Sequence, residues 1–359
     1  MRRLRNIALL LVAFFTTLIV SLGVIYKIGI SSVDKNDDKI ILVEIKKGMT
    51  TTDIAKVLKE NDLIKNEIMF KVYAKLNGVN SLKSGYFELS KNMDLEAITT
   101  KIQEGDTVDP NSIIVLFKEG LNMRGIANVI EKNTNNNADS VFALLEDETY
   151  INEVIEKYWF LEDDIKDVNI YYPLEGYLFP NTYTLRDKDV TVKEIFEIML
   201  NETDKILSKY KDEIVASKYN VHELLTIASM AELEGVSLDD RKNICGVFYN
   251  RLDKKMSLGS DVTTYYAFKV DMSERDLTKK EINTYNAFNT RGPNMSGKIP
   301  VGPVANPSKE AIEAAIIPAI NDYLYFVADK NRKVYFTKTD SEHNAKVKEL
   351  KNKGLWIEW

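Results

Sequence analysis

An apolar run near the N-terminus constrains this 359-residue chain more than any other feature. Arg2, Arg3 and Arg5 precede residues 6–26, which carry no charged side chain. A helix of that length covers about 30 Å, the thickness of the hydrocarbon core of a bilayer. A cleaved signal peptide would have a shorter apolar run and a small-x-small cleavage site, neither of which is present. The basic residues before the run place its first end in the cytoplasm. We therefore predict a cytoplasmic tail at 1–5 and a retained single-pass helix at 6–26, with the rest outside the cell membrane.

The composition excludes several classes of protein. The chain has 48 basic and 54 acidic residues, a net charge of −6, which argues against nucleic acid as a partner. One cysteine and two histidines leave no disulfide framework and little for a metal site. His222 and Glu223 begin like the zinc motif HExxH, but Thr226 stands where the second histidine is needed. We expect neither a metal nor a cofactor.

The pattern of apolar residues predicts an α+β fold. Residues 27–40 are polar and form a predicted linker. A β-rich run, a Lys-x-Gly turn and an amphipathic helix then occur twice, within 41–58 and again within 112–130. We predict a β/α module over 41–155 and a mixed α/β domain over 156–359.

Two consecutive helices in 221–252 carry the most informative acids. The first is predicted to end at Glu234, because Gly235 is a natural helix stop. At 100° per residue, Glu234 falls within an apolar stripe of this helix and Glu232 falls near its edge. An acid in an apolar wall has a raised pKa, which suits a general acid. The alternative is an exposed glutamate at a frayed helix end.

Polar and aromatic residues also gather in loops. Residues 171–183 combine five aromatic side chains with two prolines, which indicates either a sugar-binding platform or a buried corner. Residues 259–266 and 285–308 mix hydroxyl, amide, proline and glycine residues, a composition that suits either a cleft wall or simple turns.

These segments together resemble one known family. Over nearly its whole length the chain is similar to the endolytic murein transglycosylases of the YceG-like (MltG) family. The resemblance is carried, in family order, by the N-terminal anchor and by KSGYFEL, LEGYLFPNTY, ASMAELEG before a VFYNRL helix, SDVTTYYA, YNAFNT, PVGPVANPS, YLYFVAD and FTKTDSEHN. The LEGYLFPNTY segment departs from the family at Asn181, where aspartate is usual. The loop from Asn289 to Pro300 is also longer than usual.

The resemblance implies an activity and a site. The family cleaves the β-1,4 bond between N-acetylmuramic acid and N-acetylglucosamine in peptidoglycan and leaves 1,6-anhydro ends, an activity that ends the elongation of nascent strands. Its catalytic glutamate falls on Glu234. The implied substrate-binding residues are Glu232, Glu175, Tyr177, Asn250, Arg251, Asp261, Thr263, Tyr285 and Asn286. The region after the linker resembles a LysM-like module, and the implied partners are peptidoglycan strands, penicillin-binding proteins and other proteins of wall synthesis and division.

Two other functions stay open at this point. A muramidase would pair Glu234 with a second acid, either Glu232, Glu175 or Asp261, because hydrolysis normally needs two carboxylates. A non-catalytic scaffold of the wall-synthesis machinery would bind glycan without needing Glu234. A pyridoxal-phosphate lyase would need a lysine in a matching motif, and this chain does not have one.

Overall fold

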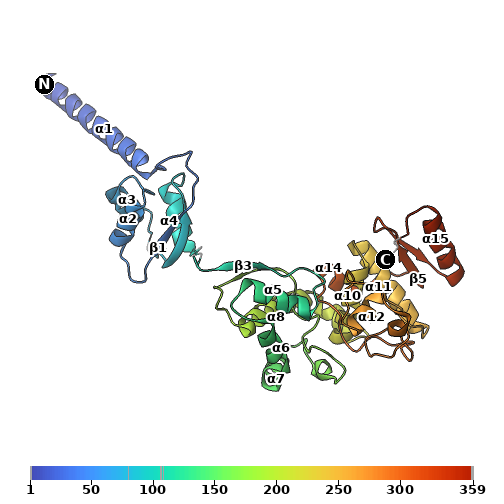
Figure 1. Cartoon of the computed structure of the whole chain (residues 1–359). Helices are drawn as coiled ribbons and strands as arrows, with labels where there is room; N and C mark the ends of the chain where they lie inside the picture. The colour runs from blue at the N-terminus through green and yellow to red at the C-terminus, as the bar shows by residue number, and fades with distance from the viewer. Residues whose placement is uncertain (1, 80, 106, 108, 357–359) are drawn as a thin grey trace. The chain divides into compact units, whose positions relative to one another are not determined.

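The computed structural model describes residues 2–79, 81–105, 107 and 109–356, with side chains from Leu9 onward. The chain forms two compact units, Met1–Ser112 and Ile113–Trp359 (Figure 1). Helices dominate both units, and the described strands form antiparallel two-stranded sheets. The prediction of a mixed α+β fold is confirmed.

The first element is the long helix α1 (Arg2–Ile30). Its segment Leu9–Ile30 is apolar and long enough to cross a membrane, as either an anchor or a signal sequence would be. The tail predicted for residues 1–5 lies outside the described side chains. The helix continues past the predicted end at residue 26 because its last turn is held: Lys65 Nζ donates to the carbonyl of Ile28 at 3.2 Å.

The predicted linker is not a free tether. The backbone N–H of Asp34 donates to the carbonyl of Lys91 at 3.0 Å, and that of Asn92 donates to the carbonyl of Asp37 at 3.0 Å. Together with the last turn of α1, these bonds fix most of the segment 27–40 against the small unit.

The small unit is an antiparallel strand pair with two helices in the connection. Its elements in chain order are β1 (Ile41–Ile45), α2 (Thr51–Glu60), α3 (Glu67–Leu76), β2 (Gly85–Leu89) and α4 (Leu95–Glu104). In the β1–β2 register, Val43 lies opposite Phe87, and both are buried. The Lys-x-Gly turn places Gly48 at φ 89°, a left-handed conformation that favours glycine. Alternate residues of the strands therefore form the core with the apolar faces of the helices.

The larger unit begins with a second strand–turn–helix segment. Its elements are β3 (Ile113–Leu116), α5 (Met123–Asn133), α6 (Ala138–Glu146), α7 (Glu148–Lys157), β4 (Thr182–Leu185), α8 (Val192–Leu207), α9 (Lys211–Ala216), α10 (Val221–Glu234), α11 (Leu238–Asp253), α12 (Asp261–Ala267), α13 (Lys279–Ile282), α14 (Lys309–Ile316), β5 (Tyr325–Ala328), β6 (Val334–Thr337) and α15 (Asp340–Asn352). Gly120, in its Lys-x-Gly turn, has φ 75° and repeats the geometry of Gly48.

The unit boundary lies earlier than the sequence placed it. We predicted a division at residues 155 and 156, but the compact units meet between Ser112 and Ile113. The reason is strand pairing: β3 forms an antiparallel pair with β4, and Val115 lies opposite Tyr183. The second repeat is therefore part of the larger unit.

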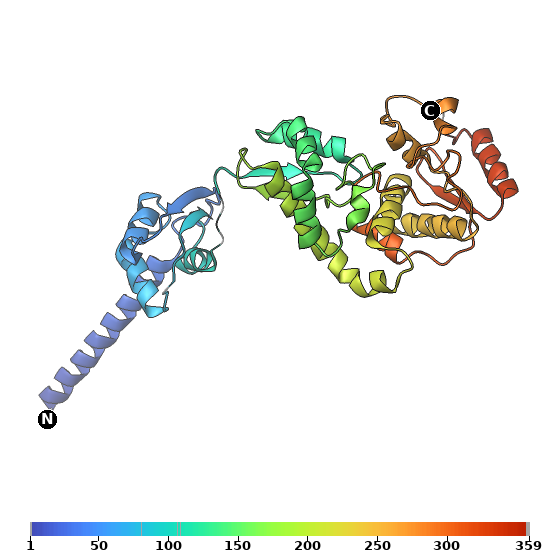
Figure 2. The ribbon, with the colours of Figure 1, turned by 90° about the horizontal axis from the view of Figure 1, so that it is seen from below.

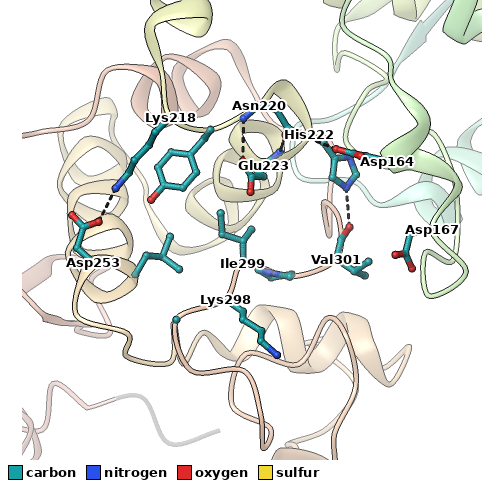
Figure 3. Close-up of a pocket in the computed structure, with 14 residues that line it drawn as sticks. Asp164, Asp167, Lys218, Asn220, His222, Glu223, Asp253, Lys298, Ile299 and Val301 are labelled. Atoms are coloured by element: carbon teal, nitrogen blue, oxygen red, sulfur yellow. Dashed lines mark hydrogen bonds and ion pairs between the residues drawn. The ribbon is translucent and has the colours of Figure 1, made fainter.

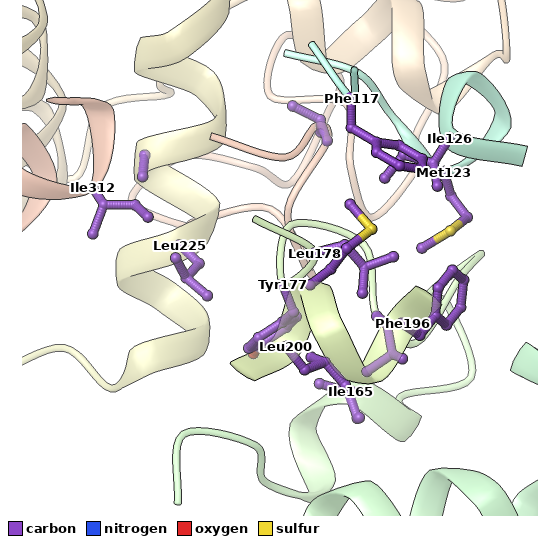
Figure 4. Close-up of a cluster of buried hydrophobic side chains, with 14 of the residues drawn as sticks. Phe117, Met123, Ile126, Ile165, Tyr177, Leu178, Phe196, Leu200, Leu225 and Ile312 are labelled. Atoms are coloured by element: carbon purple, nitrogen blue, oxygen red, sulfur yellow. The ribbon is translucent and has the colours of Figure 1, made fainter. Parts of the chain in front are cut away.

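The core of the larger unit surrounds α10. Figure 4 shows Leu225 of this helix in the same apolar cluster as Tyr177, Leu178 and Phe196. Helices α10 and α11, yellow in Figure 2, pack against each other and against α14. Every residue of α10 from Leu224 to Ala231 is buried. The residues of the predicted apolar stripe, among them Leu224, Ile227 and Met230, are therefore buried, and neighbouring elements cover the other side of this stretch as well.

The last strands form a hairpin close to α11. Strands β5 and β6 pair in antiparallel fashion through a turn at Asp329, and their residues are half-buried. Phe326 of the hairpin packs against Phe248 of α11 with ring centroids 6.0 Å apart. This contact joins the hairpin to the helix that follows α10.

Candidate active site

Glu234 is the last residue of α10. The helix begins with a capping box between Asn220 and Glu223 and ends at Gly235, which turns into an extended conformation. A Cβ atom on Gly235 would lie 2.7 Å from Cγ of Arg241, so the turn needs glycine. The helix thus presents Glu234 at a sharp turn and at the negative end of its dipole.

One hydroxyl group holds the carboxyl group of Glu234. The Ser260 hydroxyl donates to its Oε1 at 2.7 Å. Ser260 precedes α12, yet its side chain does not make the usual N-cap bond of a serine in that position. The hydroxyl that would cap α12 therefore contacts the acid.

A buried network of hydroxyl groups fixes Ser260. Its N–H donates to Oγ1 of Thr290 at 2.9 Å, and Oγ1 of Thr263 donates to its carbonyl at 2.7 Å. The two threonine hydroxyls also contact each other at 2.8 Å. Because both threonines are fully buried, the wall that faces Glu234 has little freedom to move.

The surroundings of Glu234 favour its protonated form. Burial raises the pKa of Glu234 to about 6, while the Ser260 hydroxyl acts in the opposite direction. Asp261 raises this pKa further and Arg291 lowers it, and these two side chains form an ion pair with each other. The acid thus has no cation of its own and holds a proton up to nearly neutral pH.

Glu232 has a different set of partners on the same helix. Its side chain is 6% exposed and accepts from Arg241 Nη2 at 2.7 Å. It also accepts from the backbone N–H of Ser308 at 3.0 Å and from the Ser308 hydroxyl. Because Ser308 is the N-cap of α14, Glu232 joins α10, α11 and α14.

Glu175 is a second buried acid with internal partners. Its Oε2 accepts from the N–H of Met123 at 2.9 Å and from the Tyr266 hydroxyl at 3.0 Å, and its Oε1 accepts from Asn306 Nδ2 at 3.2 Å. Burial raises the pKa of Glu175 to about 7, although these donors act in the opposite direction. Glu175 therefore joins the start of α5, helix α12 and the 303–308 loop.

Three further predicted site residues have internal partners: Tyr177 is buried, and Asn250 and Arg251 are half-buried. Tyr177 is 1% exposed, and its hydroxyl contacts Nδ1 of His222 at 2.8 Å. The side-chain amide of Asn250 donates to the carbonyl of Tyr323 at 3.0 Å. Arg251 Nη1 donates to the carbonyl of Leu258 at 2.7 Å, just before Ser260. Their contacts hold the walls around the site in place.

The remaining predicted residues lie near the surface. Asp261 has a side chain that is 53% exposed, and Tyr285 is 56% exposed. Asn286 Nδ2 donates to the Tyr171 hydroxyl at 2.8 Å. The structure therefore brings Glu234, Asp261 and Thr263 together around the 260–263 segment.

The sequence interpretation missed four residues that contact the predicted site residues or each other: Ser260, Thr290, Arg291 and Ser308. Ser260 and Thr290 lie within SDVTTYYA and YNAFNT, whose density of polar side chains was the available signal. The pairing of Asp261 with Arg291, and of Glu232 with Ser308, had no signal because it depends on how distant loops meet.

A pocket of about 660 Å³ lies at the opposite end of α10 (Figure 3). It is lined by Asp164, His222, Lys298 and Val301 among others, and it includes none of the predicted site residues. Its polar groups contact each other: His222 Nε2 meets the carbonyl of Val301 at 2.8 Å, and Lys218 pairs with Asp253 at 2.6 Å. The pocket is therefore separate from the surroundings of Glu234.

The fold and the site define an α+β protein in which Glu234 has a raised pKa and accepts a hydrogen bond from Ser260. The chain belongs to the YceG-like family, whose sequence profile matches residues 43–349. It is 39% identical over 328 residues to the endolytic murein transglycosylase of Bacillus subtilis strain 168. This alignment covers 90% of this chain and 88% of that protein. It is 34% identical over 340 residues to the endolytic murein transglycosylase of Streptococcus pneumoniae D39, of which it spans 60%.

A solved structure agrees with this assignment. The crystal structure of a yceG-like protein from Listeria monocytogenes matches 86% of this chain and 99% of its own, with a TM-score of 0.60 and 37% sequence identity.

Proposed function

We propose that this protein is an endolytic murein transglycosylase that cleaves the β-1,4 bond between N-acetylmuramic acid and N-acetylglucosamine within glycan strands. Its products carry 1,6-anhydro ends, and cleavage ends the elongation of a nascent strand. The observation that carries the proposal is Glu234, an acid with a pKa of about 6 that only a hydroxyl group holds. Membership of the family and the names of its relatives support the substrate.

One carboxyl group suffices for this reaction. Protonated Glu234 gives its proton to the glycosidic oxygen as the bond to C1 breaks. The resulting carboxylate then takes the proton from the C6 hydroxyl of the muramoyl residue, whose oxygen bonds to C1. The substrate supplies the nucleophile, so no water enters the product, and Glu234 regains its proton for the next cycle.

The muramidase alternative needs a second free acid. Hydrolytic glycosidases place two carboxyl groups on either side of the bond. Glu232 and Glu175 are both engaged by internal donors, and Asp261 is paired with Arg291. These contacts favour transglycosylation over hydrolysis.

The other predicted residues fall into two proposed roles. Asp261, Tyr285 and Asn286 lie near the surface and contact the glycan strand. Residues with internal partners keep the walls of the site in place, and these are Glu232, Glu175, Tyr177, Asn250, Arg251 and Thr263.

The proposed location is the outer face of the cell membrane. Helix α1 is retained as an anchor, the N-terminus lies in the cytoplasm, and the chain that follows α1 lies outside. The small unit acts as a LysM-like module that positions the strand, and its antiparallel strand pair with two helices in the connection supports that role. Penicillin-binding proteins and other wall-synthesis and division proteins are the proposed partners. Protease added to spheroplasts should digest the chain after residue 40, and full protection would contradict this topology.

The reaction is tested by mass spectrometry of peptidoglycan digested in H₂¹⁸O. The full chain in detergent should give anhydro ends without ¹⁸O, and Glu234→Gln should give almost none. Glu213→Gln, an exposed acid on α9, is the matched control and should act as the wild type does. Reducing ends that carry ¹⁸O would identify a muramidase. An active Glu234→Gln variant would contradict the assignment, and glycan binding without any products would favour a scaffold.

A further inference from the structure

Helix α3 carries a row of apolar side chains that its own unit does not cover. Ile68, Val72 and Leu76 are 61%, 38% and 69% exposed. They are spaced four residues apart and therefore lie on one face of the helix. The core of the unit lies against the opposite face, where Phe70 and Ala74 are buried.

This helix crosses the end of α1. Three contacts join them: the Lys65 ammonium with the Ile28 carbonyl at 3.2 Å, Met69 with Gly29, and the Asn77 amide with the Tyr26 hydroxyl at 3.5 Å. From Met69 to the C-cap Asn77 the chain advances about 12 Å along α3, whereas their partners Gly29 and Tyr26 lie within about 5 Å of each other along the axis of α1. Helix α3 therefore runs across α1 and not alongside it, at the end of α1 where Figure 1 shows the small unit beginning.

The close approach of the two helices fixes this arrangement. A Cβ atom on Gly29 would lie 2.6 Å from Cγ of Met69, so glycine lets the helices touch. Tyr26 and Ile30 of α1 pack against the core of the small unit. The end of the apolar helix and the unit that follows it are thus one packed structure, without a flexible tether between them.

The contacts also set the depth of α3. The apolar segment of α1 ends at Ile30, and all three contacts fall between Tyr26 and Gly29. If Leu9–Ile30 crosses the bilayer, then α3 lies where the hydrocarbon meets the lipid headgroups. Lys75 is exposed beside Leu76 on the helix, and a long cationic side chain suits the phosphate level of a membrane.

We propose that α3 lies in the plane of the membrane surface, with Ile68, Val72 and Leu76 against the lipid. The inference rests on the proposed anchor. It adds that the small unit is held flat at the bilayer, at a height set by α1. The glycan strand that this unit engages is then one that lies next to the membrane, as a newly polymerised strand does.

Spin labels on the full chain in phosphatidylcholine–phosphatidylglycerol nanodiscs test the proposal. Ile68→Cys, Val72→Cys and Leu76→Cys each place the label at an exposed position, and the native Cys245 is fully buried. Leu18→Cys reports whether α1 is inserted, and Ile114→Cys, 73% exposed in the larger unit, is the matched apolar control. The measurement is the ratio of collision rates with O₂ and with a water-soluble nickel chelate.

At positions 68, 72 and 76 the ratio should be several-fold higher than at Ile114 and lower than at Leu18. A ratio equal to that at Ile114, with Leu18 in lipid, would overturn the inference and leave the anchor intact. A Leu18 label in water would overturn both. Spin–spin broadening at the three positions that disappears on dilution with unlabelled protein would show that a second copy of the chain covers the apolar face of α3. That result would also overturn the inference.

Discussion

Glu232 and Glu234 lie two residues apart at the end of α10; the Glu232 side chain is 6% exposed, and Glu234 is half-buried. Glu232 meets a guanidinium group and two donors from Ser308, and it fastens three helices together. Glu234 meets a single serine hydroxyl, and burial raises its pKa to about 6. The comparison teaches that burial alone does not make a general acid. Glu234 also lacks a cation partner, so little offsets the cost of desolvating its charged form, and its pKa rises.

The largest expected effect is on catalysis by Glu234→Gln. The amide keeps the size of the side chain but cannot give up and regain the proton, so the rate should fall by about 10²–10⁴-fold. The rate is measured as anhydro ends released from peptidoglycan. Thermal unfolding at pH 4 should hardly change, because the amide there replaces a carboxyl group that the folded state holds protonated. An equal loss in Glu232→Gln would remove the contrast between the two acids.

The next effect is on stability, through Glu232→Gln. Removal of this charge leaves the buried Arg241 with only Glu310, an exposed partner at 2.9 Å. Breaking a buried ion pair destabilises a fold by about 3–5 kcal/mol, and Glu310 places this case at the low end. Urea unfolding measures the free energy. Activity per folded molecule should fall far less than in Glu234→Gln, and the reverse pattern would exchange the roles of the two acids.

A third effect is the pH dependence of stability. The pKa of Glu234 is about 6 in the folded protein and 4.5 at its ordinary value, so the folded state binds the proton more tightly. The stabilisation is present below pH 4.5 and is lost as the pH rises through about 6, with a total of at most about 2 kcal/mol. Urea unfolding from pH 4 to pH 8 should show this loss in the wild type relative to Glu234→Gln. The contribution of Glu175 is common to both proteins and cancels. A constant difference across this range would contradict the raised pKa.

The smallest effect is expected from Ser260→Ala. The hydroxyl lowers the pKa of Glu234, so its removal should raise that pKa and move the alkaline limb of the rate profile, where the protonated acid is lost, to higher pH. Loss of one hydrogen bond of about 1.4 kcal/mol corresponds to a tenfold fall in rate. The measurement is kcat/KM against pH, with Ser140→Ala, an exposed hydroxyl on α6, as the control. An unchanged profile would show that Ser260 does not act on Glu234.

Local signals in the sequence predicted many elements correctly. Both Lys-x-Gly turns, the end of α10 at Gly235 and the capping box at Ser237 depend on residues close in the chain. The raised pKa of Glu234 was also predicted, from its place at the end of an apolar stripe whose residues the structure buries. Its actual cause is the wall around Ser260, which packs over the end of the helix.

Long-range pairing explains what the sequence could not predict. The unit boundary was placed too late because nothing local indicates that β3 pairs with β4, some seventy residues further on. Tyr177 was expected in the substrate site, but a tyrosine suits a sugar platform and a buried corner equally well, and here it lies in the core. The partners of Glu232 come from α11 and the start of α14, which only the folded chain brings together.

The proton affinity of Glu234 tests the account most directly. Infrared difference spectra between wild type and Glu234→Gln isolate the carbonyl band of this one protonated carboxyl group. The account predicts that the band persists through pH 5 and disappears with a midpoint near pH 6, as the pKa of about 6 requires. A midpoint at or below 4.5, the ordinary value, would show that Glu234 is already charged where the enzyme needs an acid, and would contradict the account.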